Sequence, residues 1–152
     1  MVDSYTVLIV EDDFDDALIL KTALKREGME NSVQVVSSGF EAMDYVCAKG
    51  KYADRSKFPF PNAVFTDLKM PRMGGFEILE WLRNHPETAG IPIIILTSSR
   101  MDKEINRAYE MGANAYLVKP SNIDDLQKMV KTAFEFWRWC EVPRVADADK
   151  MH

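Results

Sequence analysis

The chain has 152 residues, the size of one compact domain, and 47% of them are apolar, which excludes a disordered chain. Its net charge of −5 argues against a nucleic-acid-binding module, because phosphate contacts require a basic face. The two cysteines, Cys47 and Cys140, lie far apart without metal-ligand spacing, and no stretch has the pattern of a signal peptide or a membrane span. We therefore expect a cytoplasmic protein with no disulfide framework and no membrane partner.

The predicted elements alternate between strands and helices from the first residues onward. Residues 5–10, YTVLIV, are an apolar run typical of a buried strand. Residues 14–27 carry apolar side chains at helical spacing, and Gly28 ends this helix. A second strand at 32–38 and a second helix at 39–50 follow.

The second half of the chain continues the alternation. In chain order its strands and helices are predicted at 62–67, 76–85, 91–97, 102–112, 114–119 and 122–140. The strand at 91–97, IPIIILT, is the most apolar and is expected to be central. Alternation with short connections predicts an α/β fold, in which a five-stranded parallel sheet has helices on both faces.

Polar residues stand at the carboxyl ends of four predicted strands, the edge at which open α/β sheets bind their ligands. These residues are Glu11, Asp12 and Asp13, then Asp67, then Thr97 and Ser98, and finally Lys119 and Pro120. Carboxylates that converge at one edge repel each other and require a cation. We predict Mg²⁺, because it needs few carboxylates and keeps water positions free for a phosphate.

The remaining polar residues at this edge suit a phosphoryl group. Lys119 would add a mobile positive charge, and Thr97 would add a hydroxyl donor. An aspartate can itself act as the nucleophile and form an aspartyl phosphate, so Asp67 is the candidate acceptor. Asp15 and Asp16 are interpreted as first-turn acids that the dipole of the first helix favours.

The segments VLIVEDD, FTDLKMP with its following GG, ILTSS and YLVKP together resemble the receiver domain of bacterial two-component response regulators. The resemblance covers roughly residues 5 to 138, and the spacings from Asp67 to Thr97 and to Lys119 also suit that family. It implies a flavodoxin-like (βα)5 fold with strand order 2-1-3-4-5.

The same resemblance implies a role for each acid. Asp67 would be the phospho-acceptor, and Glu11 and Asp12 would be the acidic pair that holds Mg²⁺, with Asp12 the more direct ligand. The backbone carbonyl of Lys69 would be a further metal ligand. Asp13 would have a supporting role at most.

The resemblance also implies how the phosphoryl group is held and detected. Thr97 and Lys119 would bind its oxygens, and Tyr116 would be the aromatic switch residue that moves inward when Thr97 is drawn toward the phosphate. The peptide bond between Lys119 and Pro120 is often cis in this family.

We expect a receiver domain at residues 1–140 and a short polar tail at 141–152, which is too short for an output domain. Output would then depend on protein interaction. In the final helix, one apolar stripe is expected to face the sheet. Its members are Ile123, Leu126, Val130, Ala133, Phe134 and Trp137. A second stripe, formed by Met129, Phe136 and Trp139, predicts a partner surface and a homodimer, unless the tail folds back over it.

Two further segments resemble the single-domain regulators that partner phytochrome-type histidine kinases. They are the ending FEFWRWCEVP and the connection AKGKYADRSKFPFPN, whose role the sequence does not define. The implied partners are a sensor histidine kinase and a downstream protein, without nucleic acid. The chain would not be an enzyme beyond its own phosphorylation and dephosphorylation.

Other functions remain open at this point. The chain could be a phosphorelay intermediate, or a pseudo-receiver that only binds partners, although pseudo-receivers lose the acids or the lysine. An aspartate-nucleophile phosphatase usually carries a second aspartate two residues after the first, where this chain has Lys69. A flavodoxin-like cofactor binder would need a phosphate-cradling loop after the first strand, where this chain has acids.

Overall fold

The computed structural model describes residues 5–28 and 33–141. Its strands are β1 (Val7–Val10), β2 (Val33–Val36), β3 (Ala63–Thr66), β4 (Ile93–Thr97) and β5 (Ala115–Val118). Its helices are α1 (Phe14–Arg26), α2 (Gly39–Val46), α3 (Gly75–Arg83), α4 (Asp102–Glu110) and α5 (Ile123–Trp139), with a short 3-10 helix, η2 (Gly50–Tyr52), after α2. Each predicted strand and helix is present, with ends that differ by a few residues.

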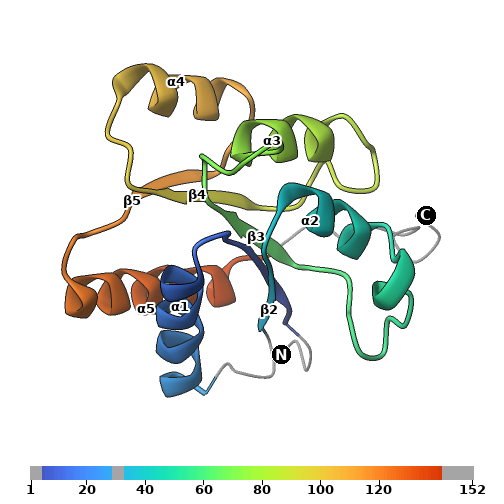
Figure 1. Ribbon diagram of the computed structural model, residues 1–152, viewed down its shortest axis with the longest axis horizontal. Coiled ribbons are helices and arrows are strands. Elements are labelled where there is room, and N and C mark those ends of the chain that lie inside the picture. Colours follow the sequence, from blue (N-terminus) through green and yellow to red (C-terminus); the bar gives the residue numbers. More distant parts are fainter. Residues whose placement is uncertain (1–4, 29–32, 142–152) are drawn as a thin grey trace.

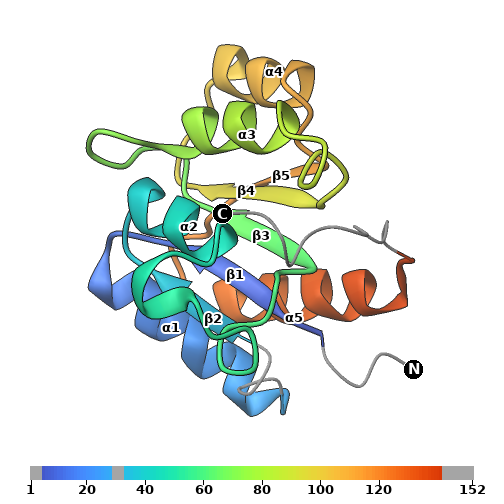
Figure 2. The same ribbon diagram turned by 90° about the vertical axis from the view of Figure 1, so that its right-hand side faces the viewer.

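The strands form one parallel sheet in the order β2-β1-β3-β4-β5, which confirms the predicted topology. The sheet lies between two helical layers (Figure 1), with α1 and α5 on one face and α2, α3 and α4 on the other. Figure 2 shows the same layers after a quarter turn. The predicted α/β fold with helices on both faces is therefore confirmed.

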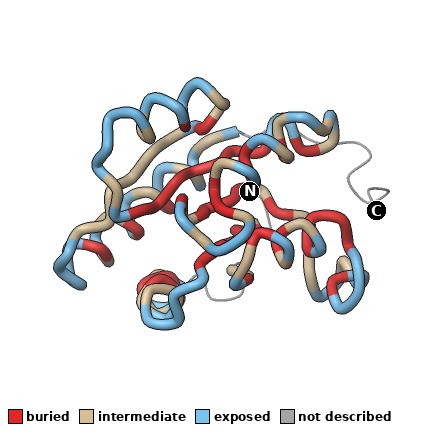
Figure 3. Tube along the Cα trace, turned by 45° about the horizontal axis from the view of Figure 1, so that its top comes forward, coloured by how far each residue is buried: buried red, intermediate tan, exposed pale blue. Residues whose placement is uncertain are grey.

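Alternate side chains of β1 contribute to two separate cores. Val7 and Ile9 pack into the core under α1 and α5, whereas Leu8 and Val10 pack into the core under α2, α3 and α4. Every residue of β1, β3 and β4 is buried, and Figure 3 shows this as a continuous buried path through the sheet. Strands buried on both faces require continuous apolar runs, which is why they are readable from the sequence.

Helix α2 ends at Val46, earlier than predicted, because the chain turns away at Ala48, whose φ of 55° is incompatible with the helix. Arg55 then donates to the carbonyl oxygens of Tyr45, at 2.9 Å, and Val46, at 2.6 Å. A basic side chain on the last carbonyls stabilises the end of a helix. Part of the connection at 48–62, which had no predicted role, therefore caps α2.

Helix α5 buries one face against the sheet. Leu126, Val130 and Phe134 are buried, as predicted, and the ring of Phe134 stacks on Phe65 of β3 with centroids 4.6 Å apart. The prediction that Ile123 faces the sheet is wrong, because this side chain is 56% exposed. Ile123 is the first residue of α5, and the buried face of the helix begins only at Leu126.

The other apolar side chains of α5 divide into two groups. Ala133 and Trp137 are half-buried and pack against the same core, as predicted. Phe136 is 61% exposed and Trp139 is 89% exposed, so neither belongs to the buried face of α5. Met129, assigned to the same outer stripe, is half-buried and also contacts the core under α1 and α5.

No helix within residues 5–28 and 33–141 is long and apolar enough to cross a membrane. The predicted tail begins at Glu141, and residues 142–152 lie outside the described residues. The alternative prediction, that this tail covers the second stripe of α5, therefore concerns residues that the structure does not describe.

Replacing Phe134 by alanine should lower the free energy of unfolding by about 3–5 kcal/mol, because it removes a buried aromatic ring and leaves a cavity. The matched control is Phe40→Ala, at a ring that is 55% exposed, which should change the free energy by about 0.5 kcal/mol or less. Urea denaturation followed by circular dichroism measures both. Equal losses in the two variants would contradict the packing described for α5.

Candidate functional site

Hydrogen bonds of the sheet continue past the strand ends and place the acidic residues. Val10 of β1 is in register with Thr66 of β3, so Glu11 and Asp67 follow at the same level of the sheet. The amide of Asp67 donates to the carbonyl of Val10 at 3.0 Å, and the amide of Glu11 donates to the carbonyl of Val36 at 3.0 Å. The sheet itself therefore holds the backbone of both acids.

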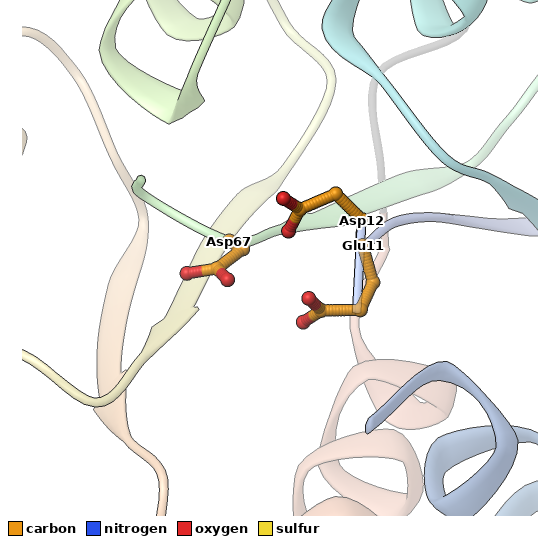
Figure 4. A group of neighbouring side chains, drawn as sticks. All are labelled: Glu11, Asp12 and Asp67. Atoms are coloured by element: carbon orange, nitrogen blue, oxygen red, sulfur yellow. The ribbon is translucent and has the colours of Figure 1, made fainter. Parts of the chain in front are cut away.

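Three carboxylates converge beyond these strand ends. Glu11, Asp12 and Asp67 each offer a carboxylate oxygen, and these oxygens all lie within 4.8 Å of one another (Figure 4). Glu11 is buried, Asp67 is half-buried and Asp12 is exposed. Three negative charges so close repel each other. Oxygen ligands with one open side suit a hard divalent cation that keeps several waters.

The ammonium group of Lys119 lies beside the same carboxylates. Its Nζ is 2.7 Å from Glu11 Oε2, 2.9 Å from Asp16 Oδ2 and 3.5 Å from Asp67 Oδ2, and the side chain is only 7% exposed. Burial acts to lower the pKa of Lys119, but the bonds to Glu11 and Asp16 and the charge of Asp67 together raise it above its usual value. Lys119 is therefore a permanent positive charge in the site.

The carboxyl group of Glu11 titrates near neutral pH. Burial raises the pKa of Glu11 to about 7, and the charge of Asp67 acts in the same direction. The bond from Lys119 lowers this pKa but offsets only part of the increase. A bound divalent cation would favour the ionised form of Glu11, so metal binding and proton release are linked.

The loop after Asp67 packs back onto the turn that carries it. Asp67 Oδ1 accepts a hydrogen bond from the amide of Leu68 at 2.7 Å, which leaves Oδ2 on the side of Lys119. The amide of Gly75 donates to the carbonyl of Leu68 at 2.9 Å, and a Cβ atom at Gly75 would lie 2.7 Å from the Asp67 carbonyl oxygen. Only glycine allows α3 to begin this close to Asp67.

Thr97 and Tyr116, the two residues predicted to act as a switch, both bind Ser99 in the loop after β4. Thr97 ends β4 at the same edge of the sheet and is buried, and its Oγ1 accepts a long hydrogen bond of 3.4 Å from the amide of Ser99. Tyr116 donates its hydroxyl to the carbonyl of Ser99 at 3.1 Å and packs against the core under α2, α3 and α4. The phenol of Tyr116 therefore already lies against this loop.

Lys69 connects the loop after β3 to α4. Its side-chain Nζ lies 3.3 Å from Glu104 Oε1, and Glu104 also accepts a hydrogen bond from the hydroxyl of Ser99. The loop that follows Asp67 and the loop that follows Thr97 are thus joined through one carboxylate of α4.

Lys119 directly follows Val118, the last residue of β5, and its backbone is held at the edge of the sheet. The amide of Lys119 donates to the carbonyl of Thr97 at 2.7 Å, which extends the ladder between β4 and β5 beyond its last strand residue. The peptide bond between Lys119 and Pro120 is trans, so the cis form implied by the family resemblance is not present here.

Asp16 belongs to the site, and the sequence analysis missed it. It lies in the first turn of α1, as predicted, and its amide donates to the carboxylate of Asp13 at 2.9 Å. Its own carboxylate, however, contacts Lys119. A signal for this was present, because Asp16 lies one and two helical turns before the buried Leu20 and Ala23, and so shares their face of α1.

Comparison with known proteins identifies the family of the chain. The family model that describes the response regulator receiver domain matches residues 7–131. The chain belongs to this family. A receiver domain takes part in phosphorylation-based two-component signalling, and the match is to neither a phosphatase nor a flavin-binding family.

Several relatives are similar over most of their length. The response regulator Rcp1 of Synechocystis sp. is 31% identical over 131 residues, which are 86% of this chain and 87% of that protein. The crystal structure of the phosphorylated cyanobacterial phytochrome response regulator RcpA has a TM-score of 0.85 at 29% identity, over 93% of this chain and 99% of that one. The Mn²⁺-bound form of Rcp1 has a TM-score of 0.82 at 30% identity, over 92% and 99%.

Binding of a divalent cation should strengthen as the pH rises. Below its pKa of about 7, Glu11 holds a proton that the cation must displace. The apparent association constant for Mn²⁺ should therefore increase about tenfold between about pH 6 and pH 8, as measured by calorimetric titration. Glu11→Gln should remove most of this dependence. An association constant that stays constant in the unmodified protein would argue against Glu11 as a ligand.

Proposed function

We propose that this chain accepts a phosphoryl group on Asp67 from the phosphohistidine of a sensor histidine kinase. The observation that supports this proposal is the position of Asp67, which lies among Glu11 and Asp12 and 3.5 Å from the ammonium group of Lys119. A carboxylate nucleophile for phosphorus needs a strongly positive environment, because the incoming group is itself negative. The receiver domain would occupy residues 1–140.

The metal that we assign to this site is Mg²⁺, with the carboxylates of Glu11, Asp12 and Asp67 and the backbone carbonyl of Lys69 as its protein ligands. Bound there, it would neutralise part of the charge of the carboxylates and of the phosphoryl oxygens. The four oxygen donors fit a hard cation, and the exposed side of Asp12 leaves room for water and phosphate.

In the transfer itself, a carboxylate oxygen of Asp67 attacks the phosphorus atom. The bond between phosphorus and the histidine nitrogen breaks, and the imidazole leaves with the bonding electrons. Lys119 and the hydroxyl of Thr97 donate hydrogen bonds to the phosphoryl oxygens. The reaction ends with an aspartyl phosphate, so the chain acts as a switch rather than as a catalyst for other substrates.

The signal would leave the site through the loop after β4. Tyr116 and Glu104 both bind Ser99, two residues beyond Thr97, so a displacement of Thr97 toward a phosphoryl oxygen would be felt by both. We propose that this shifts the population between two arrangements of the face formed by α4, β5 and α5. The chain would signal in the cytoplasm through a protein partner, without nucleic acid.

The kinase partner that we propose is of the phytochrome type. The support is the similarity to RcpA, a phytochrome response regulator, over 93% of this chain. The downstream partner would bind the face that changes on phosphorylation.

We also propose a homodimer through the last helix. Phe136 and Trp139 are exposed, and Phe136 and Met129 line a groove of about 800 Å³ between α5 and the edge strand β5. Large apolar side chains that gather around a groove on a sheet edge are typical of an interaction surface.

Incubation with acetyl phosphate and Mg²⁺ should add one phosphoryl group to the protein, as measured by intact mass. Asp67→Asn should abolish the adduct, because an amide cannot act as the nucleophile. Asp15→Asn, at an exposed acid of α1, should retain it. Absence of an adduct from the unmodified protein under every condition would instead favour a pseudo-receiver that only binds partners.

The double variant Phe136→Ala and Trp139→Ala should shift the protein from dimer to monomer in analytical ultracentrifugation, because it removes the exposed rings of α5. Phe40→Ala, which removes an exposed ring of α2, should leave the sedimentation unchanged. If the double variant sediments like the unmodified protein, α5 is not the dimer interface.

A further inference from the structure

Lys119 makes its two shortest bonds to carboxylates other than that of Asp67. Its Nζ lies 2.9 Å from Asp16 Oδ2 and 2.7 Å from Glu11 Oε2, and both are hydrogen bonds. The distance to Asp67 Oδ2 is longer, at 3.5 Å, and beyond ordinary hydrogen-bond length. The short, charge-assisted bonds of Lys119 are therefore directed away from the residue that we expect to be phosphorylated.

Phosphorylation of Asp67 would change what Lys119 must bind. A phosphoryl group brings close to two negative charges and three strong acceptor oxygens to the side where Lys119 now makes only its long contact. The bonds to Glu11 and Asp16 use two of the three N–H donors of the ammonium group, so one donor is left for a phosphoryl oxygen. The same two bonds hold Nζ 3.5 Å from Asp67 Oδ2, so a movement of Nζ toward Asp67 would lengthen at least one of them.

Burial decides which of these two partners can be released. The side chain of Glu11 is 2% exposed, so water cannot replace the bond that Lys119 makes to this buried carboxyl group, and its loss is costly. The side chain of Asp16 is 36% exposed, so water can replace the ammonium group there at little cost. Asp16 is therefore the partner that Lys119 leaves first.

We propose that Asp16 is a positioning residue that holds Lys119 back from Asp67 in the unphosphorylated protein and releases it to the phosphoryl group. This inference rests on the proposed function of Asp67. Asp16 would then reduce the affinity of the site for a phosphoryl group, and its bond to Lys119 would connect α1 to the end of β5 only while Asp67 is unmodified.

The test compares two isosteric variants in their binding of beryllofluoride, a phosphoryl mimic, in the presence of Mg²⁺. Asp16→Asn keeps the size of the side chain but removes the charge that holds Lys119. Asp15→Asn removes the same charge from the same exposed turn of α1, at a residue that is not a partner of Lys119. A fluorine NMR titration should show binding about fivefold tighter for Asp16→Asn and within about twofold of the unmodified protein for Asp15→Asn.

Three further measurements test for other causes of tighter binding. The gain should persist at about 1 M salt, where the Debye length is about 3 Å and long-range effects of charge are screened. Circular dichroism should show an unchanged fold, and Asp16→Ala, which removes the competing oxygen as well, should bind at least as tightly as Asp16→Asn.

The outcomes separate this inference from the proposed function. If the unmodified protein binds beryllofluoride but Asp16→Asn binds no more tightly than Asp15→Asn, the role of Asp16 is overturned and that of Asp67 stands. Weaker binding by Asp16→Asn would mean that Asp16 presents Lys119 to the phosphoryl group, which also overturns the inference. If the unmodified protein neither binds the mimic nor accepts phosphate, both proposals fail.

Discussion

The ammonium group of Lys119 lies among the carboxylates of Glu11, Asp16 and Asp67, and the site depends on this contact. Glu11 and Asp67 follow β1 and β3, and Asp16 lies in the first turn of α1. Without a positive charge between them, these acids would repel each other. Because the side chain of Lys119 is only 7% exposed, its charge must in turn be paired. The pairing is incomplete, since Asp12 adds a further carboxylate to the cluster. The excess of negative charge is what makes the site a place for a divalent cation.

A parallel sheet is the reason why these residues can meet at all. In such a sheet every strand ends at the same edge, so residues that follow β1, β3, β4 and β5 become neighbours although they are far apart in the chain. The two cores on either side of the sheet hold the strands, and backbone hydrogen bonds just beyond the strand ends hold Glu11, Asp67 and Lys119. Gly75 then allows α3 to start directly above this edge.

The site is also connected to the surface that would carry the signal. Glu104 of α4 binds Lys69 in the loop after Asp67 and Ser99 in the loop after Thr97, and Ser99 also binds Tyr116. Under the proposed function, a change at Asp67 would therefore reach α4 and β5 through polar contacts that are already formed. Close by, the edge strand β5 and helix α5 border an apolar groove, at which we propose that a second copy of the chain binds.

The sequence by itself determined the elements, the topology class and the edge that carries the site. Strands buried on both faces need continuous apolar runs, so the polar residues after them mark where the strands stop, and the position of Asp67 at the end of β3 could be predicted from this pattern. The pairing of Asp16 with Lys119 could not be predicted, although Asp16 lies on the buried face of α1. The capping of α2 by Arg55 could not be predicted either. Periodicity shows which face of a helix turns inward, but it does not show which distant side chain that face will meet. Only the packing of α1 beside the end of β5 decided that partner.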